Sequence, residues 1–186
     1  MAVSPLSSAL IQPTGRAGQV SFMSDELLKF LRDASQAYPM FNKEMRIAAE
    51  AVAQTVVDKA KVNAAGQPKH GPNRPGSSGR SQAQAVVEGL RARRDRIPTI
   101  KLDANRGYVS ASRSNRKRKA NVKMSDVFFG AEFGGRRRPT TQQFLRHRGR
   151  QGYFFWQAVR DSKSYIAKEY GDSIERVLKK LAAGAT

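Results

Sequence analysis

The sequence has 186 residues, of which 39% are hydrophobic, and its 34 Lys and Arg against 15 Asp and Glu give a formal net charge of +19. A chain of this length can bury one working core, and so unbalanced a charge favours a polyanionic partner, because a strongly cationic subunit repels itself. Disulfides, thiolate metal sites and cysteine nucleophiles are excluded, since the sequence contains no cysteine. The two histidines, His70 and His147, lie far apart in the sequence, so no metal site and no cofactor are expected.

The N-terminal residues 1–22 mix Ser, Pro, Gly and isolated apolar residues without a period, which favours an irregular arm. They contain no basic segment followed by an apolar run, and no stretch of the chain reaches the length of a transmembrane helix. We therefore expect a soluble protein without a membrane partner. A first helix is predicted from Asp25 and Glu26, two acidic residues suited to a first helical turn, and it ends before Pro39.

A longer helix is predicted over residues 42–65, because its apolar residues recur at spacings of three and four. The members of this face are Met45, Ala48, Ala49, Val52, Val56 and Ala60. Since alanine dominates the face, we expect its packing partner to approach closely. Gly66 ends the helix, and residues 67–80 are rich in Pro and Gly without a large apolar side chain, which predicts a mobile loop.

The middle of the chain combines a short helix with a predicted hairpin. Ser81 marks the start of the helix, which runs into a basic patch at residues 91–96. Residues 97–102 predict an edge strand because Pro98 cannot donate to a ladder, and a return strand would complete a β-hairpin over residues 97–111.

A basic loop is predicted over residues 112–123, which are almost purely cationic, and further strands are expected near residues 120–145. The long C-terminal helix, predicted over residues 153–182, has the most regular apolar spacing in the chain. Gly171 within it weakens the helix by about 1 kcal/mol relative to Ala.

Together these elements predict an α+β fold, in which a small antiparallel β-sheet packs against a long N-terminal helix and a long C-terminal helix. We expect an arm over residues 1–22, a single domain over residues 23–182 with two loops, and a short tail at residues 183–186.

No catalytic constellation is present in the sequence. It has no Gly-x-Ser-x-Gly elbow and no phosphate-cradling glycine loop. Glu132 lies between aromatic residues and is followed by arginines, surroundings that can tune a carboxylate for acid–base work, yet no second acid, base or metal cluster accompanies it. We predict that the protein is not an enzyme, with a nuclease acting through Glu132 as the weaker alternative.

Basic segments point to nucleic acid or to an acidic partner surface, because cations that neutralise phosphates release counterions without reading sequence. The candidate contact residues are Arg113, Arg116, Lys117, Arg118, Lys119, Arg136, Arg137 and Arg138. Arg146, Arg148 and Arg150 follow the second segment. The four consecutive aromatics at residues 153–156 would suit base stacking, but they point in all directions at a helix start, so we interpret them as core or subunit interface. A non-specific nucleic-acid-binding protein is the main alternative function.

The segment VFFGAEFGG (residues 127–135) is followed by Phe144-Leu145 and then by HRGRQGYFFWQAV. In this order the sequence resembles the phage neck or tail-completion protein family, the small head–tail connector proteins of siphovirus-type phages, and is nearest to versions in phages of actinobacteria. That family's signature is an aromatic-rich segment ending in Glu-Phe-Gly, a short loop, a phenylalanine-containing turn and a C-terminal helix. The strong part of the resemblance covers residues 124–182, and Gln143 stands where many relatives carry Pro.

This resemblance implies a structural subunit of the ring, at the neck, tail-completion or tail-terminator level, that joins the DNA-filled capsid to the tail. The implied assembly is a closed ring of identical subunits, which in this family is often six-fold, a homohexamer. In such a ring one patch of each subunit meets a different patch of the next. Its implied partners are connector or stopper proteins, tail-tube or tail-terminator proteins and the DNA passing through, and its implied location is the virion, after assembly in the host cytoplasm.

The residues of the Glu-Phe-Gly block predict, independently of the resemblance, one of two roles. The block forms a subunit interface, with Glu132 as a charge partner for an arginine of the same or a neighbouring subunit, or it is ordinary core beside a turn. The expected interface residues are Phe128, Phe129, Glu132, Phe133, Phe144 and Trp156.

Overall fold

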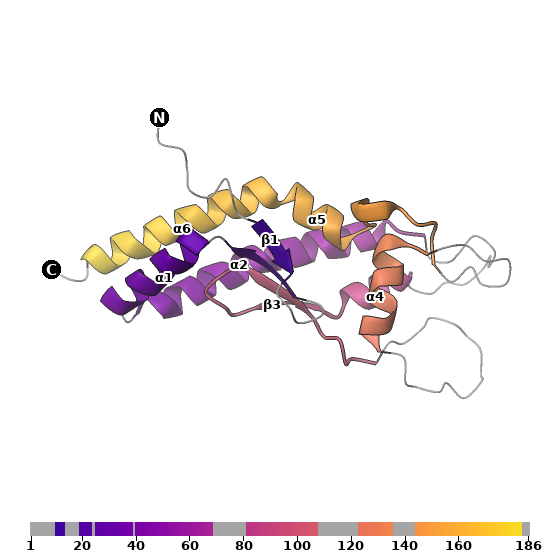
Figure 1. Cartoon of the computed structure of the whole chain (residues 1–186), viewed down its shortest axis with the longest axis horizontal. Coiled ribbons are helices and arrows are strands. Elements are labelled where there is room, and N and C mark those ends of the chain that lie inside the picture. Colours follow the sequence, from indigo (N-terminus) through magenta and orange to yellow (C-terminus); the bar gives the residue numbers. More distant parts are fainter. Residues whose placement is uncertain are drawn as a thin grey trace. The chain divides into compact units, whose positions relative to one another are not determined.

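A computed structural model of the chain describes residues 10–13, 19–23, 25–38, 40–68, 81–107, 123–135 and 144–183 (Figure 1). The elements in chain order are β1 (Leu10–Pro13), β2 (Gln19–Met23), α1 (Asp25–Ala37), α2 (Phe41–Ala65), α3 (Gln82–Val87), β3 (Leu90–Arg93), β4 (Thr99–Leu102), α4 (Met124–Phe133), the 3-10 helix η2 (Gly149–Gln151), α5 (Phe155–Asp161) and α6 (Lys163–Ala183). The chain therefore has the predicted α+β fold, with a small sheet and long N-terminal and C-terminal helices. None of the helices in the described ranges has the length and apolar character needed to cross a membrane.

The sheet has four strands in the order β1-β2-β4-β3. Strand β2 is antiparallel to β1, with Ile11 opposite Phe22, and antiparallel to β4, with Val20 opposite Ile100. Two of these strands lie in the N-terminal segment that the sequence predicted as an irregular arm, so that prediction was wrong. β2 also pairs with β4, which is distant in sequence, and a local period cannot reveal such pairing.

The strand predicted at residues 97–102 is present as β4, but the predicted hairpin partner was wrong. β4 lies between β2 and β3, and β3 forms where a helix was expected to run into the basic patch. Leu90 is buried while Arg91 and Arg93 are exposed, an alternation that suits a strand. Residues 108–111, the expected return strand, lie outside the described residues.

Helix α4 occupies residues where strands were expected, which corrects that prediction. Its residues Val127, Phe128 and Ala131 are buried at spacings of one, three and four, as on one side of a helix. Asp126 also supports a helix start, since its carboxylate accepts a hydrogen bond from the backbone N–H of Lys123 at 2.9 Å.

The C-terminal helix consists of two helices rather than one. α5 and α6 are interrupted at Ser162, while the apolar spacing continues across the break, which is why the sequence predicted a single helix. Gly171 does not end α6, which continues to Ala183.

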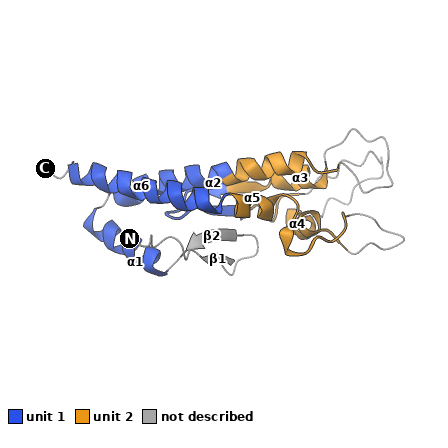
Figure 2. Cartoon of the chain, turned by 90° about the horizontal axis from the view of Figure 1, so that it is seen from above, with its two compact units in different colours: residues 1–55, 92–101, 162–186 blue, residues 56–91, 102–161 orange. Residues whose placement is uncertain are grey.

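The chain divides into two compact units, coloured separately in Figure 2. Unit 1 comprises residues 1–55, 92–101 and 162–186. Its buried cluster brings together side chains of α1, α2 and α6, namely Leu27, Leu31, Phe41, Met45, Ala49, Tyr170 and Val177. The Tyr170 hydroxyl donates to the carbonyl oxygen of Arg96, and burial raises the pKa of this tyrosine. Tyr170 is therefore a neutral hydrogen-bond donor within this core.

Unit 2 comprises residues 56–91 and 102–161. Its core includes the buried small face of α2, where Ala60 and Ala64 have no exposed surface, as expected for a close-packed alanine stripe. Helix α3 starts at Ser81, as predicted. The Ser81 hydroxyl accepts the N–H of Gln84 at 3.1 Å, and the Gln84 side chain accepts the N–H of Ser81 at 2.8 Å. This reciprocal pair is a capping box that starts α3.

Candidate functional site

The centre of the candidate site is Glu132, a carboxylate on α4 with no exposed surface. Its Oε2 accepts the backbone N–H groups of Phe154 at 3.2 Å and Phe155 at 2.9 Å, and its Oε1 accepts that of Trp156 at 2.8 Å. These amides form the start of α5, whose first N–H groups have no partner within the helix. Glu132 therefore caps a helix that begins more than twenty residues later, and we call this arrangement the Glu132 junction.

The charge state of Glu132 is set by two opposing effects. Burial strips water from the carboxylate and raises its pKa above the ordinary glutamate value, while the hydrogen bonds from the α5 amides act in the opposite direction. Desolvation is the larger effect. Glu132 is thus a buried group that binds a proton more readily than an exposed glutamate.

Gly152 makes the approach of Glu132 possible. It has a φ of +66°, and a Cβ at this position would overlap Glu132 Oε1. Both the left-handed backbone and the missing side chain are therefore needed here.

The aromatic residues after Gly152 are fixed through their backbone on both sides. Asn63 Nδ2 donates to the carbonyl of Phe154 at 3.1 Å, and Gln67 Nε2 donates to that of Tyr153 at 3.0 Å. Phe154 and Phe155 are buried and lie edge-on to Phe128, with ring centroids 6.1 and 5.9 Å away. Their rings form the core of unit 2, in agreement with the core interpretation and against base stacking.

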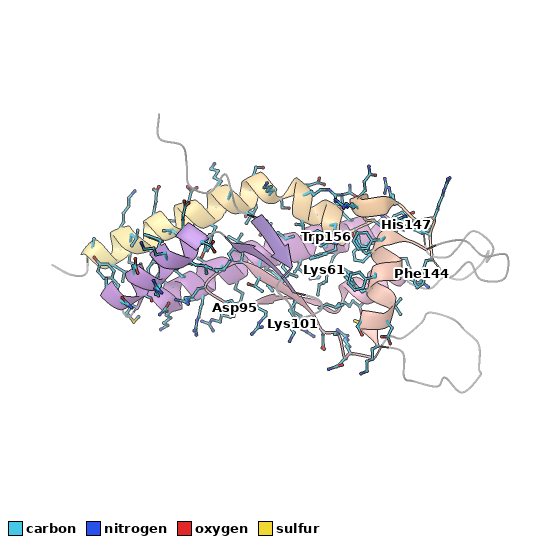
Figure 3. All side chains as sticks on the ribbon, viewed as in Figure 1. Lys61, Asp95, Lys101, Phe144, His147 and Trp156 are labelled. Carbon is cyan, nitrogen blue, oxygen red and sulfur yellow. The ribbon has the colours of Figure 1, made fainter. Side chains whose placement is uncertain are left out.

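The phenylalanine-containing turn packs directly onto α4. The Phe144 ring lies against Gly130, where a Cβ would overlap its ring carbons, and Figure 3 labels this residue beside α4. The N–H of Gly135 donates to the carbonyl of Leu145 at 2.9 Å. Gly134, with a φ of +76°, would carry a Cβ only 2.6 Å from the same carbonyl oxygen. Glycine is thus required at the end of α4 for the two segments to touch.

Residues 146–151 follow this contact, and we call them the arginine turn. The N–H of Arg148 donates to the carbonyl of Phe133 at 3.0 Å, and the Tyr153 hydroxyl donates to the carbonyl of Arg146 at 2.6 Å. The Arg148 guanidinium also lies over the Tyr153 ring, 5.3 Å from its centroid. The Glu-Phe-Gly block, the phenylalanine turn and the start of α5 are therefore one interlocked structure.

The six predicted interface residues all belong to unit 2 but differ in exposure. Phe128 and Glu132 are buried within the chain, and Phe133, Phe144 and Trp156 are partly exposed. Phe129 is 59% exposed, and its ring stacks on Phe133 with centroids 6.3 Å apart. Among the described residues, the partners of Glu132 are backbone amides of its own chain, where an arginine was expected. Three N–H groups at the start of α5 bond to its two oxygens.

The eight predicted nucleic-acid or acidic-partner contacts lie outside the described residues. They are Arg113, Arg116, Lys117, Arg118, Lys119, Arg136, Arg137 and Arg138. Most of residues 67–80 and 112–123, the two predicted loops, lie outside as well. Among the residues that the structure does describe, no three His, Asp or Glu side chains gather as a metal site requires.

Sequence reasoning did not find Gly152, Asn63 and Gln67 as parts of the Glu132 junction. The position of Gly152, directly before four consecutive aromatics, was the available signal. Nothing in the sequence near Asn63 indicates its partner, since Phe154 lies 91 residues further along the chain.

Comparison with protein-family models, with curated proteins and with solved structures finds no match to this chain.

Proposed function

We propose that this chain is a structural subunit of the head–tail connector of a tailed phage, forming a closed ring at the neck, tail-completion or tail-terminator level around the DNA passage. The proposal rests on one observation: the residues on which the resemblance is based contact one another in the folded chain. Glu132, Gly134 and Phe144 contact residues up to Trp156 through the Glu132 junction and the packing on Gly130. The residues that carry the resemblance therefore form one contiguous packed structure and are not dispersed over the fold.

The distribution of charge supports a polyanion as neighbour. All 15 Asp and Glu of the sequence lie in the described ranges, while the remaining segments contain twelve Lys and Arg and no acid. Such acid-free segments gain most from a polyanion, because no side chain of their own neutralises them. In a connector ring this neighbour is the passing DNA or an acidic partner surface.

Solvent exposure limits which of the six predicted interface residues can contact another subunit. Phe129 and Phe133 form an aromatic pair on α4, and Phe129 leaves more than half of its surface uncovered. Aromatic residues are enriched in the cores of interfaces because they bury large areas at low entropy cost. We propose this pair as the apolar anchor that meets the next subunit.

Particle composition tests the connector proposal. In tailed particles that package the genome encoding this chain, we expect mass spectrometry to detect the chain and cryo-electron microscopy to place it at the head–tail junction as a ring. Phe129→Glu should prevent its incorporation, while Val62→Glu, a matched change at another exposed apolar residue of unit 2 (71% exposed), should not. Particles that lack the chain altogether would overturn the proposal.

Non-specific nucleic-acid binding without assembly is the second candidate, and the net charge of +19 favours it. It differs in one measurable respect: a stand-alone binding protein reaches full DNA affinity as a monomer and is absent from the particle. A ring subunit instead gains affinity on assembly, because several copies contact the same duplex.

A further inference from the structure

The arginine turn presents three exposed arginines from a backbone that is held in place. Arg146, Arg148 and Arg150 are all exposed. Besides the bonds from Arg148 N–H and Tyr153 described above, the Arg160 guanidinium donates to the carbonyls of Arg150, at 3.1 Å, and Gln151. Because the carbonyls are fixed on both sides of the turn, ordering it for a ligand costs little conformational entropy.

These three guanidinium groups have no acidic partner among the described residues. No ion pair in those ranges involves Arg146, Arg148 or Arg150. The basic residues at the end of β3 and directly after it differ in this respect. Arg93 pairs with Asp95 at 3.4 Å, and Arg94 with Glu50 at 3.9 Å.

Glu132 does not neutralise the turn either, although it belongs to the same interlocked structure. Its side chain is fully buried and both of its oxygens are bonded to the α5 amides. The fold thus buries the one acidic residue of the Glu-Phe-Gly block, while the positive charges of the arginine turn stay on the surface.

The composition and openness of the turn favour phosphate over a protein surface. Residues 146–151 are Arg-His-Arg-Gly-Arg-Gln and include no apolar side chain that would form the centre of a protein interface. Gly149 has open space where its Cβ would be, so a ligand atom can approach the backbone there. The guanidinium fork matches a pair of phosphate oxygens.

We propose that the arginine turn binds the phosphate backbone of double-stranded DNA. The duplex is favoured over a single strand because the aromatics that follow the turn are poorly placed to stack on bases. Phe154 and Phe155 are buried, and the partly exposed Tyr153 ring lies under the Arg148 guanidinium, 5.3 Å from its centroid. This inference rests on the proposed function in one respect: in a connector ring, the turn is the surface of each subunit that faces the DNA passage.

The salt dependence of binding to random-sequence duplex tests the proposal on the full-length protein. The variant Arg146→Gln/Arg148→Gln/Arg150→Gln should lower the magnitude of the slope of log K against log salt by about 2.7, since each lost phosphate contact removes about 0.9. Its matched control, Lys29→Gln/Lys163→Gln/Lys168→Gln, removes the same charge from exposed positions of unit 1 and should leave the slope nearly unchanged. Circular dichroism and thermal unfolding of each variant establish that it is folded.

A third variant, Arg146→Lys/Arg148→Lys/Arg150→Lys, keeps the charge and should keep the slope. Three results would overturn the proposal: an unchanged slope in the Gln variant of the turn, an equal loss in the unit 1 control, or a loss in the Lys variant, which would trace the effect to the fold. An unchanged slope combined with lost binding to an acidic partner protein would assign the turn to that partner instead.

This assay needs no virion, so its failure is separable from that of the connector proposal. If the Gln variant of the turn has a reduced slope but the chain is absent from particles, the DNA-binding proposal is retained and the connector proposal is rejected. If the chain is incorporated into particles but the slope of the Gln variant is unchanged, the connector proposal is retained and the DNA-binding proposal is rejected.

Discussion

Glu132 performs a task that a neighbouring N-cap residue usually performs. The first amides of α5 need acceptors, and a carboxylate suits the positive end of a helix. Here the acceptor comes from α4, and its approach is possible because residue 152 lacks a side chain. The surroundings that made Glu132 an acid–base candidate in the sequence thus give it a capping role in the structure.

The need for glycine at position 152 can be measured against a second glycine that also has a positive φ. Gly149 has a φ of +63° and an open position for a Cβ, whereas Gly152 has a φ of +66° and faces Glu132. We expect Gly149→Ala to lower the free energy of unfolding by about 1 kcal/mol, the cost of the left-handed backbone. Gly152→Ala should lower it by about 2–4 kcal/mol, because Glu132 must also release its amides.

Urea denaturation of the two glycine variants provides this comparison. Equal losses at the two positions would show that the positive φ is what requires glycine at position 152, and that the contact with Glu132 contributes nothing.

The raised pKa of Glu132 predicts a pH dependence of stability. Because the folded state holds this proton at a higher pH than the unfolded state, it binds more protons between the two pKa values. The free energy of unfolding should therefore fall as pH rises from the ordinary glutamate value, about 4.3, through the raised value in the folded protein. In Glu132→Gln this contribution should be absent.

This prediction is checked by measuring the free energy of unfolding of the wild type and of Glu132→Gln at a series of pH values. The profile of the wild type minus that of Glu132→Gln isolates the group, and Glu26→Gln, at an exposed position of α1, should leave the profile as it is. A wild type that gains stability over this window relative to Glu132→Gln would mean that the α5 amides outweigh desolvation.

At the scale of elements, the starts of two helices show how local and long-range capping differ. α3 is capped from within by Ser81 and Gln84, three residues apart, and this signal is readable in the sequence. α5 is capped by Glu132 from another helix, α4, and no local sequence pattern predicts this cap. α4 also starts with a local bond, from the N–H of Lys123 to Asp126, although strands were expected in this segment.

Removing the Ser81 cap tests the contribution of the local signal. Ser81→Ala should lower the free energy of unfolding by about 1 kcal/mol, because the N–H of Gln84 loses its acceptor. Ser164→Ala, at an exposed position of α6, should change it by less than about 0.5 kcal/mol. Chemical denaturation measures both, and a Ser81 variant as stable as the wild type would show that the box does not stabilise α3.

At the scale of the whole molecule, acid and base are distributed unevenly along the chain. The described ranges contain every acidic residue, several of them in ion pairs such as Lys180 with Glu44 at 2.9 Å. The excess of positive charge lies mostly in the remaining segments and in unpaired surface groups such as those of the arginine turn. A subunit of this kind is better suited to a place beside a polyanion than to isolation, which is the physical basis of both proposals.

The sequence by itself determined the features that depend on neighbours within a few residues. It specified the α+β class, the helices at 25–37 and 41–65, the helix start at Ser81 and the strand at 99–102, because helical period, capping residues and turn formers act locally. Composition alone determined the net charge and the absence of cysteine.

Only the tertiary structure decided which distant segments meet. The pairing of β2 with β4, the use of Glu132 as a cap for α5 and the contact of Phe144 with Gly130 join residues that no local period relates. The physical reason is that backbone amides and buried carboxylates must find partners wherever the folded chain brings them, whereas sequence patterns report only the face that each segment buries.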